Sequence, residues 1–405
     1  MKPIVRAGRM KPVHSDIRGP LFVEAMKRQK QGIDILKLNT GNPATFGFGL
    51  PDSIKNALME HMQDGVGYCD FKGMPQARQA ICDYETSKGI KGITPDDVFI
   101  GNGVSEVVSF ALTPLLNDGD EVLVPSPSYS LWGNSVYLED GKPVFYTCDE
   151  QANWYPDIQD IRSKITDKTK AIVIINPNNP TGVLYPKEIL LEIIQVAREF
   201  GLLIFADEIY DRLVMDGKQH ISLASLTEDV PVITLNGLSK SHCLCGYRCG
   251  WMVISGPREL TEDYRQGIIQ LTSLRLCANT MAQIVIPAAL DDMETPASMV
   301  RPSGRIYEQR EATVRELEKI DGLSFVKNDA AFYVFPKLDV KKFNITNDKQ
   351  FAHDLLDATN ILLVPGSGFD WKDPDHFRIV MLPQADVLSD AIRRMGTFLD
   401  GYKQK

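Results

Sequence analysis

The sequence predicts an α/β protein that has a large domain with a mostly parallel sheet covered by helices, and a smaller α+β domain after it. Short apolar runs alternate with longer amphipathic stretches through most of the chain, and several runs are apolar at successive residues. Such continuous runs are typical of strands that are buried on both faces. Strands that alternate with helices favour a parallel sheet, and the pattern changes after about residue 290.

The first part of the chain supplies the strands and helices of the large domain. The stretch 187–200 (KEILLEIIQVAREF) has apolar residues at spacings of three and four and charged residues between them, which predicts an amphipathic helix. A second helix is expected over 103–116. The predicted strands are 98–101, 121–125, 143–148, 170–176, 202–208, 231–236 and 250–255.

The last part of the chain reads as the smaller domain. A long charged helix is expected over 302–320, and shorter apolar runs and two more helices follow it. The first 45 residues do not fit the parallel pattern, so we expect them to pack against this smaller domain. The predicted division is a segment over 1–45, a large domain over 46–290 and a small domain over 291–405. The remaining predicted elements are strands at 323–326, 331–336, 361–366 and 377–382 and helices at 347–358 and 384–402.

Composition excludes several classes of function. The chain has 405 residues and a formal net charge of -9, which argues against nucleic acid or an anionic membrane as the main partner, because phosphate binding needs a basic surface. No window approaches the ~18 apolar residues of a membrane span. The N-terminus is basic but lacks the apolar region of a secretory signal. Seven cysteines, an odd number, suit reduced thiols, so we expect a cytoplasmic protein.

Cys243, Cys245 and Cys249 lie within seven residues and suggest a metal clip or a redox site. His242 is adjacent, but no second ligand pair lies nearby in the sequence to complete a tetrahedral zinc site. Small packing residues are the simpler interpretation of these cysteines, and we expect no metal.

Four loops that follow predicted strands carry polar residues where ligands bind in open α/β sheets. IGNGVSE (100–106) opens a helix with glycines and suits a phosphate, although it lacks the third glycine of a dinucleotide fingerprint. IINPNNPTG (174–182) presents Asn179. A plain glycine turn and an asparagine that satisfies its own backbone are the structural alternatives.

The other two loops carry charge. Asp207 ends an apolar run, where a carboxylate is costly unless it meets a cation, and Tyr210 follows it by about one helical turn. Lys240 ends the next run, where a partly buried lysine can lose its proton and act as a nucleophile. An N-cap aspartate and a solvated surface lysine are the alternatives.

One ligand accounts for all four loops. It has a phosphate, a ring nitrogen that pairs with an acid, a ring oxygen that accepts hydrogen bonds and an aldehyde that reacts with an amine. Pyridoxal 5′-phosphate has these groups, and a lysine Schiff base with an aspartate partner is its expected protein environment.

The motifs IINPNNPTG, FADEIYD, GLSK with Arg248 eight residues after Lys240, and FRIVMLP resemble the fold-type I pyridoxal-phosphate aminotransferases of class I/II. The resemblance covers nearly the whole chain. DIRGP (16–20), LKLNTGNPATFGF (36–48), GYCDFKG (67–73), IGNGVSE and LCAN (276–279) are most similar to the bacterial glutamate–pyruvate (alanine) aminotransferases.

The resemblance assigns roles residue by residue. It implies that Lys240 forms the Schiff base, that Asp207 pairs with the ring nitrogen, and that Arg378 binds the substrate α-carboxylate with help from Gly41 and Asn179. Gly237 stands where some relatives use a phosphate-binding serine. The remaining implied cofactor contacts are Asn179 and Tyr210 at the ring oxygen, Tyr129 on the ring face, and Val104, Ser105, Ser239 and Arg248 at the phosphate, with Tyr68 reaching the phosphate of the neighbouring subunit of a homodimer.

The implied activity is ping-pong transamination of L-alanine with 2-oxoglutarate, which yields pyruvate and L-glutamate. Arg18 and Arg275 are candidates for the distal carboxylate of glutamate, with a structural ion pair as the alternative for each. The rival functions are an aminotransferase for aromatic, branched-chain or methionine substrates, a C–S lyase on the same cofactor, and a non-catalytic ligand-sensing module.

Overall fold

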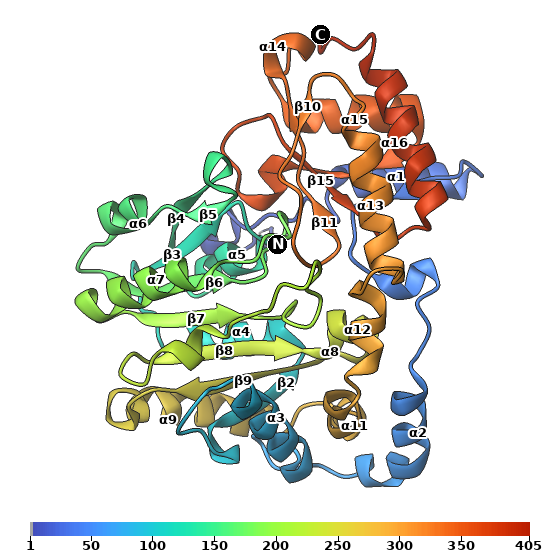
Figure 1. Cartoon of the computed structure of the whole chain (residues 1–405). Coiled ribbons are helices and arrows are strands. Elements are labelled where there is room, and N and C mark those ends of the chain that lie inside the picture. The colour runs from blue at the N-terminus through green and yellow to red at the C-terminus, as the bar shows by residue number, and fades with distance from the viewer. Residues whose placement is uncertain (1–2) are drawn as a thin grey trace.

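The computed structural model describes residues 3–405. Its centre is an eight-stranded sheet in the order β2-β9-β8-β7-β6-β3-β4-β5 (Figure 1). Strands β8, β7, β6, β3 and β4 are parallel neighbours, whereas β9 and β5 run antiparallel to their partners. This confirms the expected α/β fold with a mostly parallel sheet. The strands are β2 Val98–Asn102, β3 Glu121–Ser126, β4 Lys142–Asp149, β5 Tyr155–Pro156, β6 Thr169–Ile175, β7 Leu203–Asp207, β8 Val232–Gly237 and β9 Cys249–Ser255.

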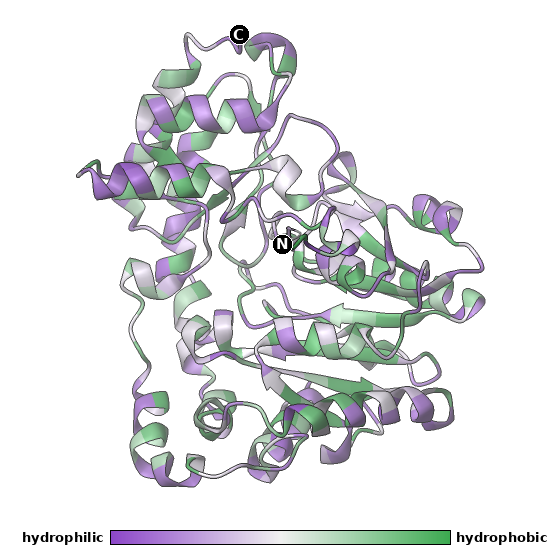
Figure 2. Ribbon diagram, turned by 180° about the vertical axis from the view of Figure 1, so that it is seen from behind, coloured by the Kyte–Doolittle hydropathy of each residue, from purple (hydrophilic) through white to green (hydrophobic). Residues whose placement is uncertain are grey.

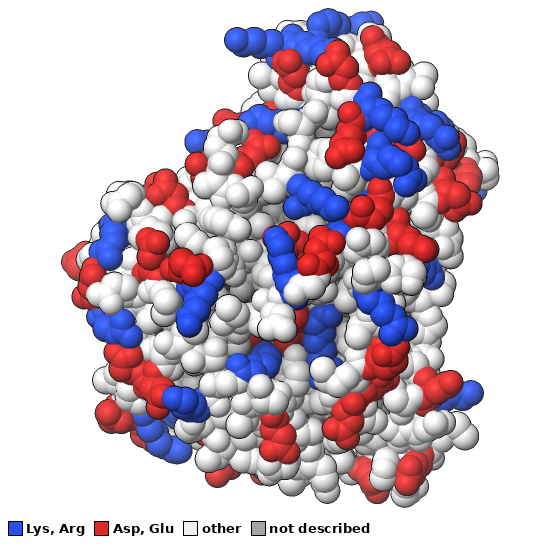
Figure 3. All heavy atoms as spheres, in the orientation of Figure 1, with Lys and Arg blue, Asp and Glu red and all other residues white. Residues whose placement is uncertain are grey.

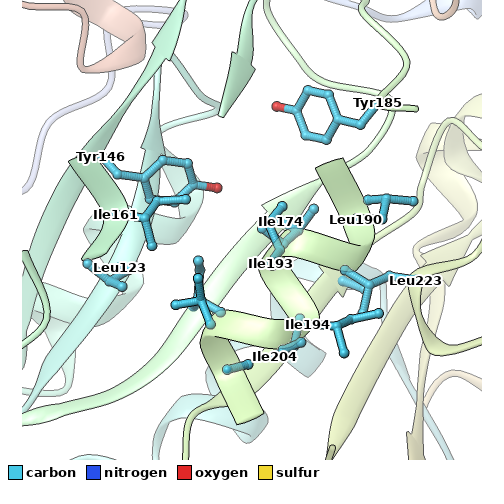
Figure 4. Packing of buried hydrophobic residues seen from close by; sticks show 14 of the residues in the cluster. Leu123, Tyr146, Ile161, Ile174, Tyr185, Leu190, Ile193, Ile194, Ile204 and Leu223 are labelled. Carbon is cyan, nitrogen blue, oxygen red and sulfur yellow. The ribbon is translucent and has the colours of Figure 1, made fainter. Parts of the chain in front are cut away.

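Both faces of this sheet are covered, because its strands present apolar side chains alternately to each face. Ile172 and Ile174 of β6 pack with α6 and α7 on one face, the packing drawn in Figure 4. Val173 of the same strand packs on the other face, with α4, α5 and α9. The covering helices are α4 Val104–Leu112, α5 Leu131–Leu138, α6 Ile158–Lys164, α7 Lys187–Phe200 and α9 Arg258–Arg275.

A third apolar cluster lies at the β2 edge of the sheet. Ile100 of β2 and Trp251 of β9 pack there against α2, α3 and α11. The helices are α2 Asp52–His61, α3 Pro75–Ser87, α10 Thr280–Ile284, α11 Ile286–Asp291 and α12 Glu294–Val300. Among residues 3–405, no single helix has the length and apolar content of a membrane span; α9 together with Thr280–Asp291 passes such a test only as a pair bent by 118°.

The C-terminal elements form a separate core, with α13 running between it and the sheet (Figure 1). Leu38, from the N-terminal segment, belongs to this core, and β1 pairs in parallel with β13. Ala25 of α1 packs against Leu356 and Leu362. The elements are α1 Pro20–Lys30, β1 Leu36–Lys37, α13 Arg305–Leu317, β10 Leu323–Ser324, β11 Tyr333–Val334, β12 Lys337–Leu338, α14 Val340–Phe343, α15 Asp348–Thr359, β13 Ile361–Leu362, β14 Val364–Pro365, β15 Phe377–Val380 and α16 Ala385–Leu399.

Hydropathy follows this layering. The strands of the large sheet are mainly hydrophobic, and the hydrophilic colour lies on helix faces and loops at the periphery (Figure 2). On the face shown in Figure 3, Lys and Arg side chains are interspersed with Asp and Glu side chains, so neither sign of charge dominates it.

Candidate active site

The predicted strand-end loops meet at one edge of the sheet. Strands β6, β7 and β8 are parallel neighbours, so the loops that follow them lie side by side. β2 and β8 are each antiparallel to β9, which lies between them, so β2 ends at the same edge. The short helix α8, Leu238–Ser241, follows β8 directly and carries Lys240.

Asp207 is the last residue of β7, and it is buried. One carboxylate oxygen accepts a hydrogen bond from Trp132 Nε1 at 3.1 Å, and the other lies 3.4 Å from the backbone nitrogen of Ile209. Burial raises the pKa of Asp207 to about 6, although the hydrogen bond from Trp132 lowers it. A buried carboxylate of this kind is stabilised by a nearby cation.

Lys240 is partly buried, and its Nζ donates to Gly41 O at 2.9 Å. A Cβ on Gly41 would collide with the hydroxyl of Tyr333, so this close approach requires glycine. Burial lowers the pKa of Lys240, but Tyr333, Cys245 and Tyr129 raise it, and the net shift of the pKa is upward. The expectation that Lys240 loses its proton easily is therefore wrong for the protein by itself.

Arg378, on β15, is a buried cation without a carboxylate partner among the described residues. Its Nη1 donates to Asn179 Oδ1 at 2.9 Å and its Nη2 to Asn39 O, while its Nε has no acceptor. The guanidinium lies 4.6 Å from the ring centroids of both Tyr333 and Phe369. Burial lowers the pKa of Arg378. Such a guanidinium can bind a carboxylate through bidentate hydrogen bonds.

The tyrosines of the site differ in exposure. Tyr210 is buried, and its hydroxyl lies 2.9 Å from that of Tyr333. Tyr129 is 36% exposed and lies near enough to Lys240 and Arg378 to contribute an upward shift to the pKa of each. Tyr68 is 84% exposed. The structure thus places Tyr210 and Tyr129 at the site and leaves Tyr68 on the surface of the single chain.

The loop after β2 forms an anion cradle. Gly103 has a φ of +83°, and Val104 and Ser105 begin α4, where backbone N–H groups lack partners within the helix. A Cβ on Gly103 would collide with the guanidinium of Arg248, so Arg248 lies directly over this helix start. Ser239 precedes Lys240 in α8. Gly237, whose Cβ would lie 2.6 Å from Cys249 O, leaves no room for a serine side chain.

Of the two interpretations of Arg275, its contacts favour the structural ion pair over a distal-carboxylate residue. Its Nη1 donates to Glu106 Oε2 at 2.6 Å, and its Nη2 donates to Phe71 O and Ile100 O. It is a structural ion pair that supports the loop of the anion cradle. Arg18, in contrast, is exposed.

The three clustered thiols point to different neighbours. Cys243 Sγ lies 3.8 Å from Met299 Sδ, and Cys245 Sγ donates to Ser239 O at 2.9 Å. Cys249 is buried in β9. Burial raises the pKa of both Cys243 and Cys249 to about 12, which makes these thiols poor metal ligands and poor nucleophiles.

Sequence reasoning missed three residues that shape the site: Trp132, Tyr333 and Asn39. Trp132 follows Tyr129 by three residues in the same motif, and its position near Asp207 could have been suspected. Tyr333 contacts Tyr210 and Arg378 but looks like an ordinary core aromatic in its apolar run. Asn39 contributes a backbone oxygen, which no side-chain pattern reveals.

Comparisons with known proteins agree with this geometry. The family described as aminotransferase class I and II matches residues 33–394. The glutamate-pyruvate aminotransferase AlaA of Haemophilus influenzae is 49% identical over 404 residues, and that of Escherichia coli K12 is 46% identical, each covering 100% of both chains. The alanine aminotransferase of Mycobacterium tuberculosis H37Rv is 45% identical over 100% of this chain and 94% of its own.

Solved structures show the same likeness. A crystal structure of an Escherichia coli aminotransferase has a TM-score of 0.98 at 46% identity and covers 100% of both chains. The alanine aminotransferase of Pyrococcus furiosus has a TM-score of 0.93 at 40% identity, over 98% of this chain and 100% of that one. With a matching sheet, a lysine and an aspartate at adjoining strand ends and full-length relatives, this chain belongs to the class I and II aminotransferase family.

Proposed function

We propose that this enzyme uses pyridoxal 5′-phosphate to transfer the amino group of L-alanine to 2-oxoglutarate, forming pyruvate and L-glutamate. The observation that carries the proposal is the pairing, in one site, of a partly buried lysine with a buried guanidinium that has no carboxylate partner among residues 3–405. An α-amino acid offers an amine, and an α-keto acid a carbonyl, to the lysine side of the site. Each also offers a carboxylate to the guanidinium. The full-length relatives named as alanine or glutamate-pyruvate aminotransferases support the choice of substrates.

The residues of the site fit the cofactor. Asp207 is a buried carboxylate without an ion pair in the described part of the chain, which suits a protonated ring nitrogen. The helix start at Val104 and Ser105, with Arg248 above it, suits a phosphate. Tyr210 and Asn179 would hold the ring oxygen, Tyr129 would cover the ring, and Ser239 would add to the phosphate site.

When bound, the cofactor supplies an aldehyde that condenses with amines and a ring that withdraws electron density from the substrate Cα. Asp207 would keep the ring nitrogen protonated, because its own burial makes an unpaired negative charge costly. Lys240 would hold the aldehyde at rest and then move the proton at the substrate Cα as base and acid. Arg378 and Asn179 would orient the α-carboxylate, with help from Gly41, whose backbone lies close against Tyr333.

We also propose a homodimer in which Tyr68 reaches the neighbouring subunit's site. Support comes from the exposure of Tyr68 together with Val66, at 76%, and Leu274, at 82%, since large exposed apolar side chains mark protein contacts. The free state of the seven cysteines supports a cytoplasmic location. Sedimentation of wild-type and Tyr68→Ala protein tests the assembly.

The division of the chain near residues 45 and 290 is likewise a proposal. It is supported by the separate C-terminal core, to which Leu38 contributes. Limited proteolysis of the native protein should cut between the two cores before it cuts within either one.

The decisive experiment is chemical. Borohydride reduction of the yellow, cofactor-loaded protein should place a pyridoxyl group on Lys240, located by mass spectrometry. The reduced protein should be inactive. The loaded protein should convert alanine only when a keto acid is present; ammonia release without a keto acid would indicate a lyase. Faster turnover of phenylalanine, leucine or methionine than of alanine would replace the proposed substrate, and a colourless protein without an adduct would refute the cofactor.

A further inference from the structure

A fully buried histidine, His376, lies two residues before Arg378 in an aromatic cage. Its ring stacks on Phe335, with centroids 4.8 Å apart and planes 19° apart. Trp154 and Trp371 meet it edge-on at 5.2 Å and 5.3 Å. No water reaches the ring, since its side chain has 0% exposure. The face of Phe335 stabilises a cation more than a neutral ring.

The charged groups around the ring are Asp375, Glu150 and Lys337. His376 Nδ1 lies 2.7 Å from Asp375 Oδ1, and Nε2 lies 3.4 Å from Glu150 Oε1 without an aligned hydrogen bond. Lys337 Nζ lies 2.8 Å from Glu150 Oε2 and 3.6 Å from Asp375 Oδ2. Two carboxylates therefore face one ammonium, and a protonated His376 makes the group neutral.

Protonation of His376 has support from its surroundings. Burial lowers its pKa, but Asp375 and then Glu150 raise it by more, so the net shift of the pKa is upward from 6.5. The same contacts lower the pKa of Asp375 to about 2. His376 carries its charge below its own folded pKa and loses it as the pH rises through that value.

The cage lies where C-terminal segments pack on the core of the large sheet, because Phe335 belongs to the same apolar cluster as Trp154. Glu150 and Trp154 follow β4 of the large sheet, whereas Phe335, Lys337 and His376 belong to the C-terminal elements. The ion pairs and the ring contacts therefore cross from the loop after β4 to the start of β15.

A continuous set of contacts leads from the cage to Arg378. His376 forms an isolated β-bridge with Lys337 directly before β15, and Arg378 is two residues further on, so we expect their side chains to leave the backbone on the same side. Phe335, which stacks on His376, meets Phe369 edge-on at 5.9 Å, and Phe369 in turn lies 4.6 Å from the Arg378 guanidinium.

We propose that His376 is a positioning residue for Arg378, and that its imidazolium holds the segment before β15 against Glu150, in the loop after β4, and so holds the guanidinium where it binds the substrate carboxylate. This inference rests on the proposed transaminase function and adds a residue to that site. Arg378 would bind the α-carboxylate of both substrates, so a change in His376 should affect the binding of both in parallel.

The charge is tested by NMR on cofactor-loaded protein labelled with 13C-histidine. The chain has six histidines, and the resonance lost in His376→Gln identifies His376. It should titrate above 6.5 or stay protonated throughout, and Glu150→Gln should lower its pKa. The control, His61→Gln, removes an exposed histidine with an ordinary ion pair to Asp64 and should leave the His376 resonance unchanged. A His376 that is neutral at pH 6.5 overturns the proposal.

Steady-state kinetics test the positioning. His376→Gln should raise KM for L-alanine and for 2-oxoglutarate together, by roughly tenfold, with kcat changed by less than about twofold, because ground-state and transition-state binding are weakened alike. In the wild-type enzyme, both KM values should rise as the pH passes the measured pKa of His376, and the variant should lack this rise. Unchanged KM values, or a loss confined to kcat, would overturn the proposal.

Two further arms keep the outcomes separate. If His376→Gln does not fold, Glu150→Gln carries the test, with a smaller parallel rise in both KM values expected and no change contradicting it. If the wild-type protein has no transaminase activity, the proposed function has failed. Calorimetric binding of 2-oxoglutarate then replaces KM, and equal affinity in wild type and variant overturns the role of His376 by itself.

Discussion

Arg275 and Arg378 are both largely buried arginines, yet they stand in opposite situations. Arg275 meets the carboxylate of Glu106, whereas the polar and aromatic partners of Arg378 within residues 3–405 are an amide oxygen, a backbone oxygen and two aromatic rings. Asp207 is the negative counterpart of Arg378, a buried carboxylate that forms no ion pair among residues 3–405, although the charge of Lys240 lowers its pKa. The difference teaches that a buried charge with its counterion in place supports the fold, and a buried charge without one marks the position of a ligand.

The largest effect should come from Arg378→Met. Removing the guanidinium should lower kcat/KM for alanine by roughly a hundred- to a thousandfold, or about 3–4 kcal/mol of transition-state binding, because a carboxylate loses a buried cationic partner. The folded protein should not lose stability, since no counterion is left behind. Steady-state assays and urea unfolding measure the two quantities, and a large loss of stability would place Arg378 in the same class as Arg275.

Asp207→Asn should stabilise the cofactor-free protein near pH 7.5 by about 2–3 kcal/mol, the equivalent of raising the pKa from 3.8 to about 6. The pKa of Asp207 in the folded protein lies above its unfolded value. The free-energy cost of the buried carboxylate is therefore absent below pH 3.8, grows between pH 3.8 and about 6, and is complete above pH 6. Urea unfolding at several pH values should show the gain shrinking towards pH 4. The variant should also bind the cofactor more weakly than the wild type does. A gain in stability that does not depend on pH would contradict the raised pKa of Asp207.

Arg275→Met should show the reverse of Arg378→Met. It strands Glu106 with Asn102 as its remaining partner, and the pair is partly exposed, so we expect about 1–2 kcal/mol of lost stability after allowing for solvent screening. KM for alanine should stay within about threefold, since no substrate contact is removed. Glu106→Gln is the matched control. A selective loss of affinity for 2-oxoglutarate would restore Arg275 as a distal-carboxylate residue.

Arg18→Ala should have the smallest effect. The residue is exposed, and exposed ion pairs contribute at most about 1 kcal/mol, so KM for 2-oxoglutarate should rise by no more than about fivefold while KM for alanine is unchanged. Arg6→Ala, another exposed arginine of the N-terminal segment, serves as the comparison. A larger, substrate-selective rise would show that Arg18 becomes buried when substrate binds.

The large sheet could be predicted closely, because its strands are buried on both faces and read as unbroken apolar runs. The run 170–176 became β6 at Thr169–Ile175, and the amphipathic helix at 187–200 became α7 with the same limits. The smaller domain was harder. Only Tyr333–Val334 of the run 331–336 became a strand, β11. Pro336 has no N–H for a ladder, and β12 begins after it, at Lys337, in a different sheet.

The site was predictable where its residues sit at strand ends, as Asp207 and Lys240 do. It was not predictable where a contact depends on the approach of distant segments. Tyr333 reaches Tyr210 across 123 positions of sequence, and Arg275 reaches Glu106 across 169. Nothing local in either segment distinguishes a ligand-binding arginine from a paired one; only the identity of the neighbour does.

Gly103 and Arg248 interlock at the anion cradle, and this has a consequence for attempts to redesign the enzyme. Any side chain introduced at 103 displaces the guanidinium, so a library that varies this position alone would return inactive clones and suggest an intolerant pocket. Acceptance of a cofactor analogue with a different anionic group would require both positions to be changed together, and the two should covary wherever this loop diverges among homologues.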